Sequence, residues 1–67
     1  MVITFIPGPS KLMEVKIIMD ELHIGLKKAK DCVDAGQFEC TEEQLKIIKP
    51  KLEEIGSSGF KKIVDLD

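Results

Sequence analysis

Few residues of this chain have the types and spacing that catalysis requires. The only histidine, His23, lies in a predicted turn, and the two cysteines, Cys32 and Cys40, lack the spacing of a metal site or a disulfide framework. Asp31 and Asp34 lie three residues apart on a predicted helix, but no base, nucleophile or glycine-rich loop accompanies them. The sequence contains no P-loop, CxxC or HExxH motif. We therefore expect no enzyme activity, no catalytic residue, no metal site and no cofactor.

Lysines are the residues best suited to binding a partner. Lys27, Lys28 and Lys30 can form a basic patch for an acidic partner, although a solvated helix face is the plainer explanation of three lysines in one helix. The net charge is −2, and arginine, tryptophan and tyrosine are absent. Nucleic-acid binders show a basic excess, so we expect no nucleic-acid partner. If the lysines did bind nucleic acid, the affinity would fall steeply with salt.

Length and composition indicate a single small globular domain. The chain has 67 residues, of which 43% are hydrophobic and 33% are charged. Its apolar runs are too short to cross a membrane, and its start lacks the basic region of a signal peptide. Two cysteines without a framework are typical of a reducing compartment. We expect a cytoplasmic protein with no membrane partner, as a monomer or weak dimer.

The first half of the chain predicts a strand, two helices and a weak strand. Residues 2–6 are β-branched and aromatic, with Ile3 and Phe5 on one face. A helix follows to about residue 22, with Ser10 as its N-cap. Four of its apolar residues have helical spacing and predict a buried stripe: Val15, Ile18, Met19 and Leu22. Gly25 then marks a turn or a point of close packing, and a second helix covers 26–35 and stops at Gly36. Residues 37–40 predict the weak strand.

The second half predicts one helix and one strand. Thr41 and Gln44 have the spacing of a capping box at the start of the helix, and Gly56 ends it. Its buried stripe consists of Leu45, Ile48, Leu52 and Ile55. Pro50 lies inside this helix and costs about 3 kcal/mol if nothing compensates it. Residues 57–59 predict a turn and 60–66 a strand. The order β-α-α-β-α-β favours a two-layer α+β domain.

One run of nine residues resembles a known family. Residues 25–33 read Gly-Leu-Lys-Lys-Ala-Lys-Asp-Cys-Val. They closely resemble the Gly-Leu-Lys-Glu-Ala-Lys-Asp-Leu-Val signature of the C-terminal domain of the bacterial ribosomal stalk protein, the acidic L-seven/L-twelve family. Residues 52–56, Leu-Glu-Glu-Ile-Gly, are similar to the family's Leu-Glu-Glu-Ala-Gly, and the likeness extends over 2–66. The resemblance implies one stalk C-terminal-like domain over 1–67, with a three-stranded antiparallel sheet covered on one face by three helices.

The resemblance also implies a role in binding proteins. In the family, the first two helices present a surface to the GTPase factors of translation. An alignment without gaps carries these roles onto eight residues: Lys11, Leu12, Val15, Lys16, Met19, Gly25, Leu26 and Lys30. Met19 then replaces a family arginine, and Lys28 replaces a glutamate.

The register of the first helix against the family has two alternatives. The ungapped register places Glu14 and Glu21 on the core face, where an unpaired carboxylate costs several kcal/mol, and leaves Val15 exposed. An alignment with a gap of one residue before Gly25 places Val15 on the core face, and it places Asp20 where the family has arginine. We prefer this gapped register because it follows the hydrophobic period. Its exposed face is Met13, Lys16, Ile17 and Asp20. The predicted protein-binding residues are Lys11, Leu12, Lys16, Ile17, Gly25, Leu26, Lys27 and Lys30.

Two functional hypotheses follow. The first is a non-catalytic protein-binding module that docks a translational GTPase or competes with the stalk for it. Because the family's dimerisation segment and hinge are absent from the sequence, we expect a free-standing regulator, such as a phage product. The alternative is an adaptor or inhibitor that reuses the fold for an unrelated protein target. The substrate adaptor of the Clp protease uses the same fold, although its binding motif is absent here.

Overall fold

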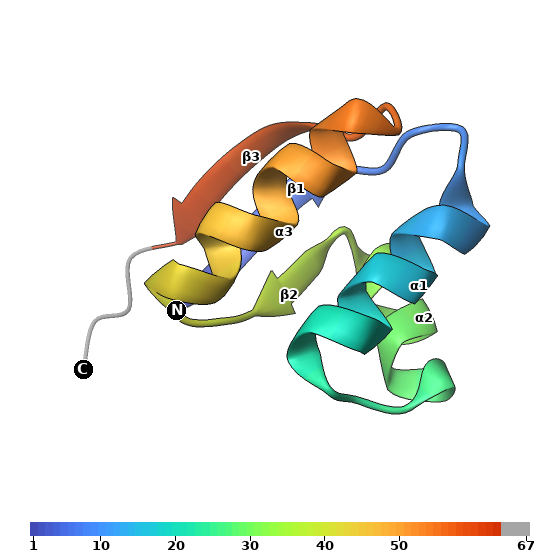
Figure 1. Ribbon diagram of the computed structural model, residues 1–67. Helices are drawn as coiled ribbons and strands as arrows, with labels where there is room; N and C mark the ends of the chain where they lie inside the picture. The colour runs from blue at the N-terminus through green and yellow to red at the C-terminus, as the bar shows by residue number, and fades with distance from the viewer. Residues whose placement is uncertain (64–67) are drawn as a thin grey trace.

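The computed structural model describes residues 1–63 and has the predicted order of elements (Figure 1). Each helix and strand lies within two residues of its expected start. The elements are β1 (Val2–Ile6), α1 (Lys11–Leu22), α2 (Leu26–Ala35), β2 (Gln37–Glu39), α3 (Glu42–Glu54) and β3 (Ser58–Ile63). The β-α-α-β-α-β order is therefore confirmed.

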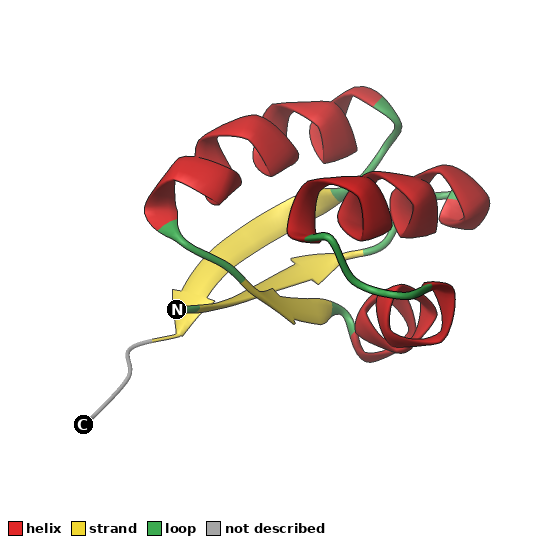
Figure 2. Cartoon of the chain, turned by 60° about the horizontal axis from the view of Figure 1, so that its bottom comes forward, coloured by secondary structure: helices red, strands yellow, loops and turns green. Residues whose placement is uncertain are grey.

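The three strands form one antiparallel sheet with the order β2-β1-β3. Ile3 of β1 lies opposite Phe38 of β2 on one side and Lys62 of β3 on the other. The register of β1 against β3 shifts near Gly59, whose φ of 65° is left-handed, as is common at a β-bulge. The helices form the second layer, with α3 beside β1 and β3, and with α1 and α2 together near β2 (Figure 2). The predicted α+β fold with a three-stranded antiparallel sheet is confirmed.

The core lies between the helices and one face of the sheet. Alternation along β1 turns Ile3 and Phe5 inward, as expected. The ring of Phe5 contacts Phe38 edge-on at a centroid distance of 5.6 Å and stacks on Phe60 at 5.7 Å, which links all three strands. The helices contribute six buried apolar residues, Val15, Ile18, Ala29, Val33, Ile48 and Leu52. Met19 and Leu22 are half-buried against this core.

The local signals at the helix ends are largely confirmed. Gly36 ends α2 with a left-handed φ of 68°, and its N–H bonds back to the last turn of the helix. Thr41 and Gln44 form the capping box, with N–H to side-chain distances of 3.1 and 2.9 Å. Ser10 precedes α1 as expected, but its side chain makes no capping bond. Pro50 lies inside α3 on its exposed side.

The expected turn at residues 57–59 is wrong. Strand β3 begins at Ser58, and Ser57 is buried. The strand extends to Ile63, and the remaining predicted strand residues, 64–66, lie outside the described residues. The shift arises because the bulge at Gly59 lets the chain join the sheet before the alternation of apolar residues starts at Phe60.

The expectation that Glu14 stays out of the core is also wrong. Glu14 is fully buried, and its Oε2 accepts hydrogen bonds from the backbone N–H of Gly8 at 2.8 Å and from the hydroxyl of Ser57. These donors come from the loops that precede α1 and β3, so one oxygen of the carboxyl group that the gapped register kept outside is hydrogen-bonded within the core. Glu21 is partly buried and pairs with Lys51 at 2.8 Å. Helix α1 therefore buries residues favoured by both registers.

Candidate protein-binding site

The start of α1 and the start of α2 enclose an apolar hollow of about 260 Å³. It is lined by Lys11, Leu12, Val15, Leu26 and Lys30. Buried Val15 forms its floor, while Leu12 and Leu26 remain 87% and 63% exposed. Of the large apolar side chains within residues 1–63, these two are the most exposed, and they face the same hollow. An exposed apolar pair beside a preformed hollow is suited to binding another protein.

Charged groups surround this hollow. Lys11 forms an ion pair with Asp34, which lies in the last turn of α2. The hydrogen bond from Lys11 lowers the pKa of Asp34 below its ordinary value; desolvation opposes this change, and the charges of Lys11 and Lys30 add to the lowering. The edge of the hollow therefore carries two lysines and one carboxylate, and its local charge is weakly positive.

Gly25 occupies the N-cap position of α2 without a steric need to be glycine. Its φ is −71°, which any residue can adopt, and a Cβ placed on it would have no heavy atom within 4 Å. The close-packing explanation of Gly25 is therefore wrong, and Gly25 lies in extended conformation between the turn at His23 and the first residue of α2. The glycine leaves the backbone at the start of α2 uncovered beside Leu26, where a partner can approach closely.

The structure brings together four of the eight predicted binding residues. Lys11, Leu12, Leu26 and Lys30 line the hollow, and Gly25 adjoins it. Lys16 and Lys27 are exposed outside the lining, and Ile17 is half-buried against the core. Val15, which only the ungapped register assigned to the binding surface, lies in the hollow as well as in the core. The binding role of these residues stays a prediction.

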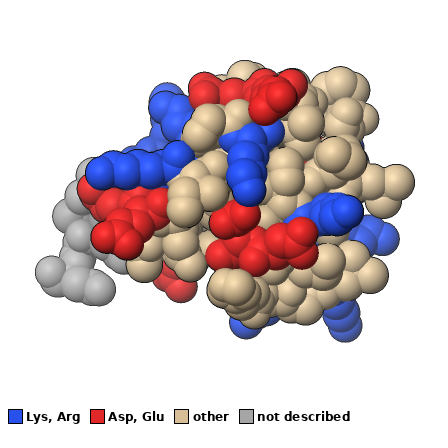
Figure 3. Space-filling view, viewed as in Figure 1, with Lys and Arg blue, Asp and Glu red and all other residues tan. Residues whose placement is uncertain are grey.

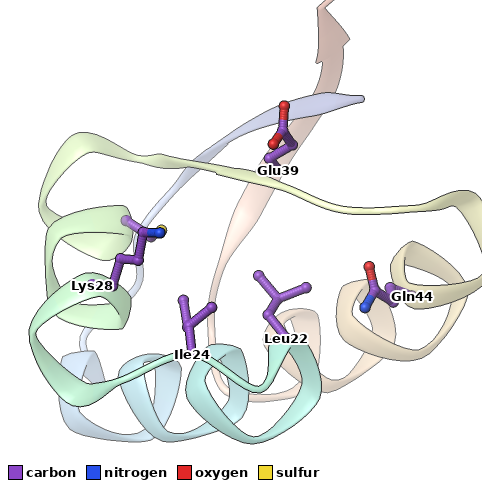
Figure 4. A pocket seen from close by; sticks show the side chains of 6 residues that line it. Leu22, Ile24, Lys28, Glu39 and Gln44 are labelled. Atoms are coloured by element: carbon purple, nitrogen blue, oxygen red, sulfur yellow. The ribbon is translucent and has the colours of Figure 1, made fainter.

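A second hollow, of about 220 Å³, lies between α1, α2, β2 and α3 (Figure 4). It is lined by Leu22, Ile24, Lys28, Cys32, Glu39 and Gln44. Burial raises the pKa of the Cys32 thiol, and the charge of Asp31 raises it further, against a lowering by Lys28. A thiol with a raised pKa is mostly protonated at neutral pH, so this hollow does not activate Cys32 as a nucleophile.

Two other kinds of functional feature are missing from the described part of the chain. Residues 1–63 contain no group of three or more His, Cys, Asp or Glu side chains placed to hold a metal ion. None of the helices in that range has the length and apolar character needed to cross a bilayer. The exposed pair Leu12 and Leu26 beside an apolar hollow makes the surface at α1 and α2 the leading candidate site.

Comparison with known proteins relates the chain to a ribosomal protein. No protein-family model matches the chain, and no solved structure matches it. Over 54 residues it is 35% identical to the large ribosomal subunit protein bL12 of Lachnospira eligens and 43% identical to that of Amoebophilus asiaticus. Each match covers 75% of this chain but only 45% and 42% of the relative, so the chain spans less than half the length of these relatives. The chain is thus a ribosomal stalk-like domain, similar in sequence to part of bL12.

Proposed function

We propose that this domain is a non-catalytic module that binds a translational GTPase through the surface between α1 and α2, in competition with the ribosomal stalk. The observation that carries the proposal is the convergence of Leu12 and Leu26 on one hollow. The relatives are proteins of the large ribosomal subunit, which is where translational GTPases act. The surface is small, so we expect weak binding, with Kd in the micromolar range or above (about −8 kcal/mol).

Gly25 supports the same surface by a separate argument. Because a side chain at this position would enter open space, the fold does not require glycine there. A partner that approaches the start of α2 does require it, since a Cβ would stand between the partner and the backbone. We therefore expect Gly25→Ala to change stability by no more than about 1 kcal/mol while weakening partner binding.

The test is binding of the domain to a purified bacterial elongation-factor GTPase, measured by NMR titration. Leu12→Ala and Leu26→Ala should each weaken binding about five- to tenfold, because each removes apolar area that the partner buries. Ile47→Ala is the matched control, since Ile47 is an exposed aliphatic residue on α3 and should leave binding unchanged. The proposal fails if no elongation or initiation factor binds at millimolar concentration.

Competition with the stalk has its own assay. An excess of the domain should slow ribosome-stimulated GTP hydrolysis by an elongation factor, and the Leu26→Ala domain should slow it less. If the parent domain binds the factor without slowing hydrolysis, it docks the GTPase without displacing the stalk. If the Leu12→Ala and Leu26→Ala variants capture a protein that is not a GTPase, and capture it as strongly as the parent domain does, the adaptor hypothesis takes precedence over this one.

A further inference from the structure

A third hollow, of about 210 Å³, lies between α3 and β3, and none of its lining residues belongs to α1 or α2. It has an apolar floor and basic walls. It is lined by Ile3, Leu45, Phe60, Lys49, Lys61 and Lys62. Its floor includes Ile3, which is buried in the core, and the half-buried Phe60 and Leu45.

Positive charge collects around this hollow. Lys49, Lys61 and Lys62 are exposed, and Lys46 lies one turn before Lys49 on α3. Within residues 1–63, the lysines of this group form one ion pair, between Lys62 and Glu42 at 3.6 Å. In Figure 3, blue side chains lie over β3 and the adjoining part of α3, with red side chains next to them. The chain as a whole is acidic, so this basic cluster is a local feature.

Next to the hollow, strand β3 also presents an edge that pairs with no other strand within residues 1–63. It is an outer strand of the sheet and is six residues long. The N–H of Phe5 bonds to Gly36 beside β2, so by alternation Thr4 directs its backbone groups towards β3, where it faces Lys61. Lys61 therefore bonds to β1, and the N–H and C=O groups of Lys62 point away from the sheet. These groups are available to another strand.

We propose that the edge of β3 and the adjoining hollow bind an extended acidic segment of a protein partner as a fourth strand. Such a strand would pair with the outward backbone groups of β3. Residues 60–63 read Phe-Lys-Lys-Ile, with two lysines between two apolar residues. The complementary segment has the pattern apolar-acidic-acidic-apolar, which reads the same in both strand directions. Its carboxylates face Lys61 and Lys62, and one apolar side chain lies on Phe60.

The same charges disfavour other occupants of the edge. Antiparallel pairing of residues 58–63 with a second copy places Lys61 and Lys62 of both copies close together, and like charges on adjacent strands destabilise pairing. A nucleic-acid backbone would meet Glu42 and Glu43 at the start of α3, which repel phosphate. A short acidic peptide strand meets Glu42 only at Lys62, with which Glu42 already pairs at 3.6 Å, and its other carboxylate faces Lys61.

The experiment is an NMR titration of the ¹⁵N-labelled chain with the capped peptide Ser-Val-Glu-Asp-Leu-Ser. We expect the largest amide shifts at Phe60 and Lys62, and a loss of affinity as salt is raised. The same peptide with Gln and Asn in place of its acids should bind at least about tenfold more weakly. Lys61→Glu and Lys49→Glu should each weaken binding about five- to tenfold.

Lys28→Glu, a change of another exposed lysine on α2, is the matched control and should leave the affinity for the peptide unchanged. If Lys61→Glu does not fold, as judged by loss of amide dispersion, Lys61→Gln replaces it. The proposal is overturned if millimolar peptide causes no shifts, if the shifts fall on α1 and α2, or if a single-stranded oligothymidylate shifts the β3 amides more strongly than the peptide does. Because Lys61→Glu and Lys49→Glu leave α1 and α2 unchanged, failure here leaves the proposed GTPase binding standing.

Discussion

Replacing Ser57 by alanine should destabilise the domain strongly for so small a change. The Ser57 hydroxyl donates to Oε2 of Glu14, a carboxyl group that is fully buried and whose Oε1 has no hydrogen-bond partner among the described residues. Alanine would leave Oε2 with the N–H of Gly8 as its single described donor. Removing one of the two described hydrogen bonds of a buried carboxyl group, whose other oxygen has no partner among the described residues, costs about 1–3 kcal/mol, and we expect about 2 kcal/mol here.

That loss is large against the whole stability of the domain. At typical values per residue, 67 residues provide about 3–10 kcal/mol of unfolding free energy. A loss of about 2 kcal/mol should lower Tm by about 8–16 °C in a domain of this size. Thermal and urea unfolding followed by circular dichroism measure both quantities. Ser58→Ala is the control, because Ser58 is exposed, and it should change stability by less than about 0.5 kcal/mol.

A double-mutant cycle with Glu14→Met tests the cause. In the methionine background Ser57 has lost its acceptor, so Ser57→Ala should cost much less than in the parent, with a coupling energy of about 1 kcal/mol or more. Additive effects would mean that the hydroxyl acts independently of Glu14. That result, or a Ser57→Ala domain as stable as its parent, would refute the reasoning.

Two further predictions concern α3 and the thiols. Pro50→Ala should raise the unfolding free energy by about 1–3 kcal/mol, because it restores a helical N–H inside α3; an unchanged urea midpoint would contradict this. Burial raises the pKa of Cys40 as it does that of Cys32, so both thiols should react with a disulfide reagent at pH 8 more slowly in the folded chain than in urea. As pH rises, the thiols of the unfolded chain therefore ionise before those of the folded chain. The contribution of the thiols to the free energy of unfolding should be fully present below about pH 8.5 and decline above it. If the parent instead gains stability above that pH relative to Cys40→Ala, the prediction is contradicted.

The sequence predicted the elements of the fold well because their signals are local. The alternation of Ile3 and Phe5, the glycine after α2 and the Thr41–Gln44 capping box each depend on residues a few positions apart. Pro50 did not end α3, because the buried stripe at Ile48 and Leu52 holds the helix on both sides of it.

Burial of Glu14 could not be predicted in the same way. One of its partners, Ser57, lies 43 residues away, and the hydrophobic period carries no information about such a pair. For the same reason the sequence left the register of α1 open, and it placed Ile17 rather than Val15 at the binding surface. A short motif indicated Gly25 and Leu26, whereas the hollow that joins them to Leu12 arises from the packing of α1 on α2.

The position of β1 in the middle of the sheet has a consequence for synthesis of the chain. The strand that is made first must wait for both neighbours, and its Thr4 bonds to Lys61, which is 57 residues later. Until that late segment emerges, the nascent chain exposes Ile3 and Phe5 without a sheet to bury them. Contacts so distant along the chain slow folding and make it cooperative, so the domain should fold only after almost all of it has left the exit tunnel.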